Sequence, residues 1–273
     1  MTADDRAITL GHPSYVWGFG QERRLELIRD HVPLEHRSVL DVGCGLGMYV
    51  RALRRFSEDV HGVDVDAEKV AEASEKLPNI RQAPAERLPF PDGRFDVVLL
   101  HEVIEHVNDD AQAISEAVRV LRSPVRTRAV VPQTGDSRTA KSDTAKEPAP
   151  KVARAGRLVI FAPNRLYPFE THGAYWGGTY HFGNIPFVNY LPDRWRKRFC
   201  PHVRTYTTRS LDRLLAGHPV RVVAHTQVYP GYDKVMRRWP LVGRTLRQAT
   251  YWAERTPLRV FGLSHFLVVE RTT

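Results

Sequence analysis

Three glycines alternate in a short stretch, Gly43, Gly45 and Gly47, directly after an apolar run that ends at Val42. Glycine allows a tight turn and removes Cβ atoms that would collide with a ligand, so this spacing predicts a ligand-binding turn after a strand. A dinucleotide fingerprint would need glycine at position 48, which holds methionine here. Asp41 precedes the turn, and an acidic residue there favours a ligand that carries positive charge and has no pyrophosphate.

Asp64 stands at the end of the next predicted strand, where a carboxylate can accept hydrogen bonds from both hydroxyls of a ribose. The alternative role for this aspartate is a helix cap, but Asp66 is better placed to cap the helix that follows. The glycine turn and Asp64 together therefore predict a site for a nucleoside cofactor.

Glu102, Glu105 and His106 form a Glu-x-x-Glu-His pattern after a further apolar run. On a helix these residues would project from one face, because they are spaced by three and four positions. Two carboxylates and an imidazole can bind a divalent cation, and the alternative is a buried hydrogen-bonded pair without metal. His172 and His181 are candidate general bases, with an ordinary loop histidine as the alternative for each.

These residues need a scaffold in which strands alternate with helices. The near-continuous apolar run over 95–100 is typical of a parallel sheet that is covered on both faces. The alternation of strand and helix along the chain indicates a doubly wound α/β fold. Apolar periodicity predicts helices over 21–30, 45–56, 67–77 and 110–122, and strands over 38–42, 60–65, 80–83, 95–100 and 157–162.

Two stretches interrupt this alternation within what we interpret as a single domain, residues 1–273. Residues 123–155 are rich in Pro, Thr, Ser, Lys and Ala and lack aromatic residues, so we expect a disordered surface insertion. Residues 163–205 are dense in aromatic side chains with interleaved glycine and proline, which predicts an irregular cap over the site. Beyond it we expect a helix over 211–216, a strand over 220–228, helices over 232–256 broken at Pro240, and a strand over 261–269.

The composition indicates a globular chain without a membrane span, because no run of about eighteen apolar residues occurs. The polar, acidic start does not predict a secretory signal, and Cys44 and Cys200 are interpreted as free thiols of a cytoplasmic protein. Charge is uneven, since residues 1–121 carry a net −8 and residues 193–273 a net +11. This asymmetry indicates an anionic partner, with an Arg-rich solvated surface as the alternative.

The stretch Arg87-Leu-Pro-Phe-Pro-Asp-Gly-Arg-Phe-Asp-Val-Val98, followed by His101-Glu-Val-Ile-Glu-His-Val107, resembles the class I methyltransferases of the type 11 group. The resemblance covers about residues 15–122 and 156–162. It implies S-adenosyl-L-methionine as the cofactor and methyl transfer as the activity. It also implies a Rossmann-like, seven-stranded sheet that is mostly parallel and has an antiparallel last strand.

By the same resemblance, the loop before Leu88 contacts adenine and His101 lies near the methionine part of the cofactor. The family usually places an aspartate four residues before this leucine, and this chain has Pro84 there. The usual contact with the adenine amino group is therefore expected to be absent or to come from the Glu86 side chain, and the backbone N–H of Ala85 can still serve.

The Glu-x-x-Glu-His pattern is also similar to that of the metal-dependent 2′-O-methyltransferases of small RNAs and of the O-methyltransferases of ubiquinone synthesis. Both groups place a further histidine after the fifth strand, so His172 and His181 are candidates for a fourth ligand beside Glu102, Glu105 and His106. Many type 11 enzymes carry Glu-His at this place without a metal, and the metal is the less favoured interpretation.

Mixed cationic and apolar stretches at 195–199 and 235–247, together with the aromatic cap, favour a lipid-like or other small acceptor that is methylated at oxygen. Such stretches also favour peripheral contact with an anionic membrane surface. An RNA 2′-O-methyltransferase is the second hypothesis, supported by the basic C-terminal part and opposed by the lack of a recognisable RNA-binding module. A partner protein that binds the cofactor without turnover is the third.

Overall fold

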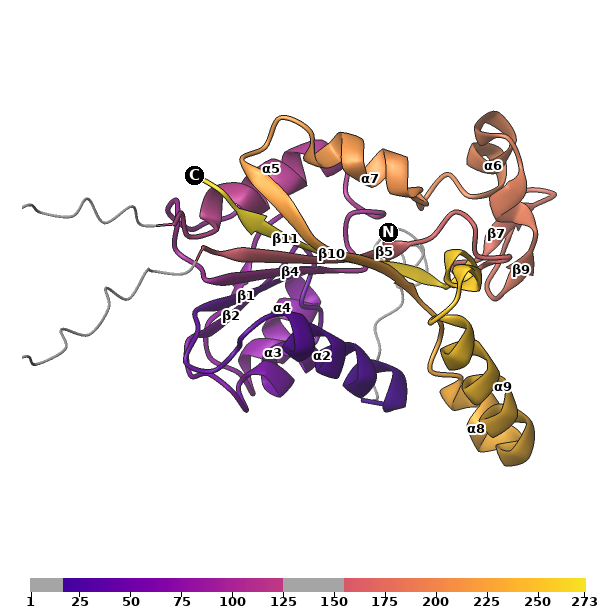
Figure 1. Cartoon of the computed structure of the whole chain (residues 1–273). Helices are drawn as coiled ribbons and strands as arrows, with labels where there is room; N and C mark the ends of the chain where they lie inside the picture. The colour runs from indigo at the N-terminus through magenta and orange to yellow at the C-terminus, as the bar shows by residue number, and fades with distance from the viewer. Residues whose placement is uncertain (1–16, 125–154) are drawn as a thin grey trace, which may run out of the picture.

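A seven-stranded sheet in the order β10-β11-β5-β4-β1-β2-β3 forms the centre of the computed structural model, which describes residues 17–124 and 155–273 (Figure 1). Strands β1 to β5 are parallel to their neighbours among themselves, whereas β11 is antiparallel to both β5 and β10. The predicted mostly parallel sheet with an antiparallel last strand is therefore confirmed. The strands are β1 (Val39–Val42), β2 (Val60–Asp64), β3 (Ile80–Gln82), β4 (Val97–His101), β5 (Arg157–Pro163), β10 (Val220–Val228) and β11 (Ser264–Arg271).

Helices cover both faces of this sheet, as a doubly wound fold requires. Along β4, Val97 and Leu99 pack into the apolar cluster under α2 and α3, while Val98 and Leu100 pack into the cluster under α5 and α7. Successive side chains of a strand point to opposite faces, which explains why this strand is apolar throughout. The helices are α2 (Phe19–His31), α3 (Met48–Leu53), α4 (Ala67–Ser74), α5 (Asp110–Val120) and α7 (Thr208–Leu215).

Most predicted elements form within a few residues of their expected bounds. The main difference is α3, which begins at Met48 rather than at Gly45. Gly45 and Gly47 have φ angles of +52° and +76°, which lie in the left-handed region and cannot belong to a right-handed helix. The two cysteines are free and buried, as expected.

The segment over 163–205 forms short, irregular elements at the end of the sheet where β5 finishes (Figure 1). Two small sheets pair β6 with β9 and β7 with β8. The insertion that we predict over 123–155 lies outside the described residues except at its edges. The elements of the segment are β6 (Phe169–Glu170), β7 (Ala174–Trp176), β8 (Thr179–His181), β9 (Ile185–Pro186), η1 (Val188–Tyr190) and α6 (Asp193–Phe199).

A helical hairpin lies between β10 and β11 and consists of α8 (Asp233–Arg238) and α9 (Pro240–Ala253), followed by η2 (Pro257–Phe261). The predicted break is confirmed, because Pro240 is the first residue of α9 and its fixed φ suits a helix start. Figure 1 shows this hairpin projecting away from the sheet. No helix in the described part of the chain is long and apolar enough to cross a lipid bilayer.

Candidate functional site

The glycine turn follows β1 and precedes α3, and its three glycines have different neighbours. A Cβ atom on Gly43 would lie 2.5 Å from Val103, and one on Gly47 would lie 2.3 Å from Leu77. A Cβ atom on Gly45 would meet nothing within 4 Å. A side chain at Gly43 or Gly47 would therefore push against Val103 or Leu77, and of the three only Gly45 borders open space that a ligand can enter. The cofactor-binding role of all three glycines stays a prediction, and the structure supports it most directly at Gly45.

Asp64 lies at the C-terminal end of β2, as predicted, and its carboxylate is tied to the glycine turn. One oxygen accepts a hydrogen bond from the Gly45 N–H at 2.8 Å, and the other accepts from the Asp66 N–H at 2.9 Å. Each carboxylate oxygen has a second lone pair, so both can still accept a hydroxyl hydrogen. Asp66 caps α4 by accepting the Glu68 N–H, which confirms its predicted role.

Asp41 is buried in the middle of β1, only 2% exposed. Burial, aided by the nearby charge of Asp64, raises the pKa of this carboxyl from 3.8 to about 8. A positive charge placed beside Asp41 would stabilise its ionised form, which is the property that we expected of this position.

His101 ends β4 with its ring packed between Tyr49 and Phe161, at centroid distances of 4.4 and 4.9 Å. Its Nε2 lies 2.9 Å from a guanidinium nitrogen of Arg24. Burial, together with the charge of Arg24, lowers the pKa of His101 to about 3, so the ring is neutral near pH 7. A neutral imidazole at this place can pack beside a cationic group without repelling it.

Arg24 is a site residue that the sequence motifs do not reveal. It reaches from α2 and donates hydrogen bonds to Glu102 and to the Ser264 hydroxyl, each at 2.9 Å. A cavity of about 250 Å³ opens here, between the start of α2, His101 and the start of α8. Helical periodicity places Arg24 beside the buried Leu25 but gives no sign that its head group turns toward the sheet.

The loop predicted to contact adenine lies between β3 and β4. Ala85 is buried there, at 8% exposed. Glu86 accepts hydrogen bonds from the backbone N–H groups of Asn108 and Asp109, at 2.9 and 3.3 Å. The Glu86 carboxylate thus holds the loop before α5, and an adenine contact from Glu86 or from the Ala85 backbone stays a prediction.

The helix expected to carry Glu102, Glu105 and His106 is absent. Glu102 adopts a φ of +56°, and the chain turns so that the His106 N–H bonds to the carbonyl of Val103. Consequently Glu102 points toward Arg24 and Ser264, at 2.9 and 2.6 Å, instead of sharing a face with the other two. The prediction of one helical face was wrong because a left-handed residue interrupts the pattern at its start.

Glu105 and His106 instead meet His172, which comes from the segment after β5. One ligand atom of each lies within 4.8 Å of those of the other two. Glu105 is 1% exposed, and neither of its carboxylate oxygens accepts a hydrogen bond from another described residue. Burial and the nearby charge of Glu102 raise the pKa of Glu105. Burial and the charge of His172 lower the pKa of His106 to about 3.

Glu170 fixes the orientation of His172. Its carboxylate accepts hydrogen bonds from the backbone N–H and from Nδ1 of His172, both at 3.0 Å. It also pairs with Arg196, and the two side chains are 1% and 4% exposed. Burial opposes ionisation of Glu170, but the His172 hydrogen bond and the Arg196 charge outweigh it and lower its pKa to about 2. With Nδ1 engaged, Nε2 is the ring atom of His172 that remains for chemistry.

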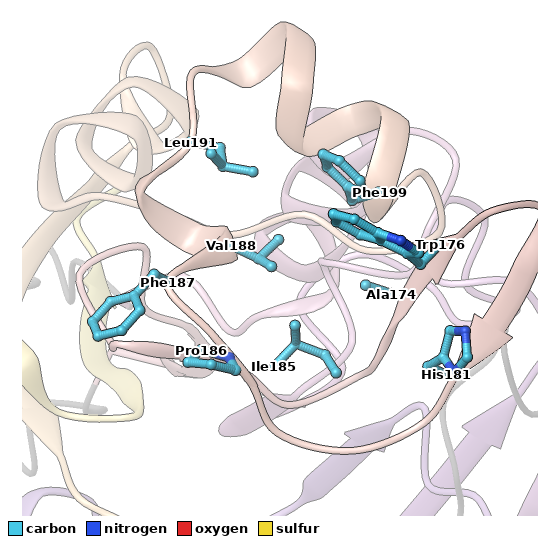
Figure 2. Close-up of a pocket in the computed structure, with 9 residues that line it drawn as sticks. All are labelled: Ala174, Trp176, His181, Ile185, Pro186, Phe187, Val188, Leu191 and Phe199. Atoms are coloured by element: carbon cyan, nitrogen blue, oxygen red, sulfur yellow. The ribbon is translucent and has the colours of Figure 1, made fainter.

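His181 lies elsewhere, on the wall of an apolar cavity of about 530 Å³ within the 163–205 segment (Figure 2). Trp176 and Phe199 stack side by side on this wall, with ring centroids 5.2 Å apart. In the described residues the group around Glu105 therefore includes His172 and not His181. The remaining lining residues are Ala174, Ile185, Pro186, Phe187, Val188 and Leu191.

The family model described as a methyltransferase domain matches residues 40–124. A protein of Mycolicibacterium smegmatis named "probable S-adenosylmethionine-dependent methyltransferase" is 41% identical over 32% of this chain and 34% of its own length. The ubiquinone biosynthesis O-methyltransferase of Methylococcus capsulatus is 33% identical over 36% of this chain and 45% of its own length. The chain thus spans a third to a half of the length of these curated relatives.

Solved structures share the fold over most of the chain. An S-adenosylmethionine-dependent methyltransferase from Mesorhizobium loti has a TM-score of 0.55 at 15% identity, covering 90% of this chain and 96% of that protein. The cyclase SpnF has a TM-score of 0.54 at 15% identity, covering 96% of this chain and 85% of that protein. Since a cyclase has the same architecture, the fold by itself leaves the reaction open.

Proposed function

We propose that the chain is a class I S-adenosylmethionine-dependent methyltransferase of the type 11 group, and that it transfers the cofactor's methyl group to an oxygen of a lipid-like acceptor. The observation that carries this proposal is the alignment of Gly45, Asp64 and His101 along the C-terminal edge of the parallel strands, where ligands of open α/β sheets bind. The expected ribose contact of Asp64 and the open space beside Gly45 fit a nucleoside cofactor at this edge.

Methyl transfer is an in-line displacement, so the principal task of the protein is to position the acceptor oxygen against the methyl group. The cavity beside His101 and Arg24 provides space for the reacting end of an acceptor. His101 is neutral and packed between two aromatic rings, so it adds no repulsion where a sulfonium would lie.

The lipid-like character of the acceptor is supported by the apolar walls of the cavity around Trp176 and Phe199 (Figure 2). A cavity of about 530 Å³ is large enough for part of a drug-sized molecule or an apolar chain. Among the relatives, the ubiquinone biosynthesis O-methyltransferases support methylation at oxygen. Such an acceptor would be met at an anionic membrane surface.

Glu105, His106 and His172 are fit to hold a divalent cation. One carboxylate and two imidazoles form a common ligand set for metals such as Zn²⁺, and ligand atoms within 4.8 Å of one another can surround one ion. The buried carboxylate of Glu105, which lies beside Glu102 and accepts no hydrogen bond from a described residue, is the observation that favours this use. Glu170 behind His172 repeats the carboxylate–histidine arrangement that orients metal ligands. When bound, the ion would supply a positive charge that lowers the pKa of an acceptor hydroxyl.

Metal content after dialysis against Zn²⁺ or Mn²⁺ tests this set without reference to activity. We expect Glu105→Gln and His172→Ala to lose the metal, whereas His181→Ala, a matched histidine outside the group, keeps it. Equal metal content in all three variants would contradict the proposed ligands. His172 would then act as a general base held by Glu170, in which case His172→Ala should still cut turnover by about 10²-fold.

Labelled methyl transfer into fractionated extracts tests the acceptor class. The full chain is incubated with methyl-labelled S-adenosylmethionine and, in parallel, a lipid extract, a water-soluble metabolite extract and total RNA. We expect label in the lipid extract, and base-stable retention there would exclude a methyl ester. Label confined to RNA would instead support the 2′-O-methyltransferase hypothesis and contradict the lipid-like acceptor.

A further inference from the structure

The hairpin of α8 and α9 has a fixed inner side. Gly243 of α9 is buried against Met236 of α8. A Cβ atom on Gly243 would lie 2.8 Å from the backbone of Met236. The Asp233 carboxylate accepts the backbone N–H groups of Phe19 and Gly20 at the start of α2, at 3.2 and 3.1 Å. The Arg247 guanidinium lies 3.9 Å over the Phe19 ring. These contacts fix which side of α9 faces the protein and which side faces away.

The outer face of α9 is apolar, which is the reverse of an ordinary surface helix. Leu241, Val242 and Trp252 are 76%, 58% and 65% exposed, and Leu246 is 36% exposed. The helical period brings these residues to one side of α9, and no charged residue interrupts them. We define the outer face as Leu241, Val242, Thr245, Leu246, Ala249 and Trp252.

Exposed basic residues lie on both helices of the hairpin and just after α9. The two acidic residues of the hairpin are engaged on the inner side, because Asp233 also pairs with Arg247 and Glu254 pairs with Arg23. Exposed cations without an ion pair to any described residue therefore dominate the hairpin, and we call them the basic rim. They are Lys234, Arg237, Arg238, Arg244 and Arg255.

We propose that the outer face of α9 docks on an anionic lipid bilayer, with its leucines and tryptophan in the acyl boundary and the basic rim at the lipid phosphates. Apolar residues on one side, flanked by arginine, are the properties of helices that lie in a membrane interface. A second copy of the chain fits less well, because a two-fold interface would bring two basic rims together. Docking would bring the proposed lipid-like acceptor within reach of the protein. Only this use of the docking rests on the proposed function.

Vesicle co-sedimentation of the full chain tests this surface. We expect binding to vesicles of phosphatidylcholine with phosphatidylglycerol, weaker binding to phosphatidylcholine alone, and weakening by salt. Leu241→Ser with Leu246→Ser should weaken partitioning about tenfold or more, since two apolar side chains no longer leave water. Val222→Ser with Val223→Ser, which changes two exposed valines on β10, should bind like the unmodified chain.

Three results would overturn the proposal. One is undiminished vesicle binding by the leucine variant when its melting temperature is unchanged. Another is a dimer in solution that the leucine variant converts to a monomer, which would make the face a subunit interface. The third is retention on RNA that the leucine variant loses. None of these measurements uses the cofactor, so a failure of methyl transfer would leave them unaffected and separately interpretable.

Discussion

At the scale of single residues, burial keeps the Asp41 carboxyl protonated, and a bound cation is needed to stabilise its ionised form. The unfolded chain releases the Asp41 proton near pH 3.8, whereas the folded protein holds it to about pH 8. The folded state therefore binds the extra proton in this interval, and Asp41 lowers the free energy of unfolding as pH rises from about 4 to 8. A cationic cofactor beside the carboxylate reverses this preference, so binding and proton release are coupled.

We predict that affinity for S-adenosylmethionine rises with pH up to about 8, relative to an Asp41→Asn variant in which this dependence is lost. The variant also corrects for titration of the ligand's own amino group. Titration calorimetry in buffers of different ionisation enthalpy measures both the affinity and the protons released. Parallel pH profiles for the two proteins would show that Asp41 does not sense the bound cation.

At the scale of elements, the glycine turn separates a folding role from a binding role. Gly47→Ala should destabilise the protein by about 1–3 kcal/mol, because the new methyl meets Leu77 and the φ of +76° disfavours a side chain. Gly45→Ala adds only the backbone strain, about 1–2 kcal/mol, but its methyl enters the open space beside Asp64. We therefore expect Gly45→Ala to lose more cofactor affinity and Gly47→Ala to lose more thermal stability. If Gly47→Ala lost more cofactor affinity and Gly45→Ala lost more thermal stability, the ligand would not bind beside Gly45.

The 163–205 segment depends on its buried ion pair. Glu170→Gln leaves Arg196 charged and buried, which should cost about 3–5 kcal/mol, and Glu170→Gln with Arg196→Met should restore much of it. Because the pKa of Glu170 is lowered from 4.5 to about 2, its stabilisation is complete above about pH 4.5 and is lost as pH falls toward 2. Thermal melting of the three proteins from pH 7 to 3 measures this. Equal melting temperatures would mean that the pair contributes nothing to stability.

The sequence predicts those elements whose periodicity or glycine spacing is local. The strands before Gly43 and at Val97–His101, the cap at Asp66 and the break at Pro240 all follow from such signals. Contacts that close over long sequence separations leave no periodic pattern. The approach of His172 to Glu105 is therefore expected only from the family resemblance, which does not choose between His172 and His181. The turn of Arg24 toward His101 is not expected, and Glu102 departs from its pattern through a single left-handed residue.

At the scale of the whole molecule, an acidic cofactor half is joined to a basic C-terminal half, and the structure gives each a different surface. The cofactor edge contains the buried aspartates and neutral histidines, while the hairpin at the same end of the sheet carries exposed leucine, tryptophan and arginine (Figure 1). This separation fits an enzyme that takes its cofactor from solution and its acceptor from a membrane. The fold allows other reactions, as the cyclase with the same architecture shows.

Formation of S-adenosylhomocysteine tests the central claim most directly, because it is the cofactor product that methyl transfer leaves behind. The full chain is incubated with S-adenosylmethionine and lipid-extract vesicles, and the product is quantified by mass spectrometry beside an Asp64→Asn variant. We predict multiple turnovers that depend on the lipid extract and fall by about tenfold or more in the variant, because a ribose hydrogen bond to a charged acceptor is lost. Tight binding of S-adenosylmethionine without any S-adenosylhomocysteine, in the presence of lipid, metabolite and RNA extracts alike, would contradict it.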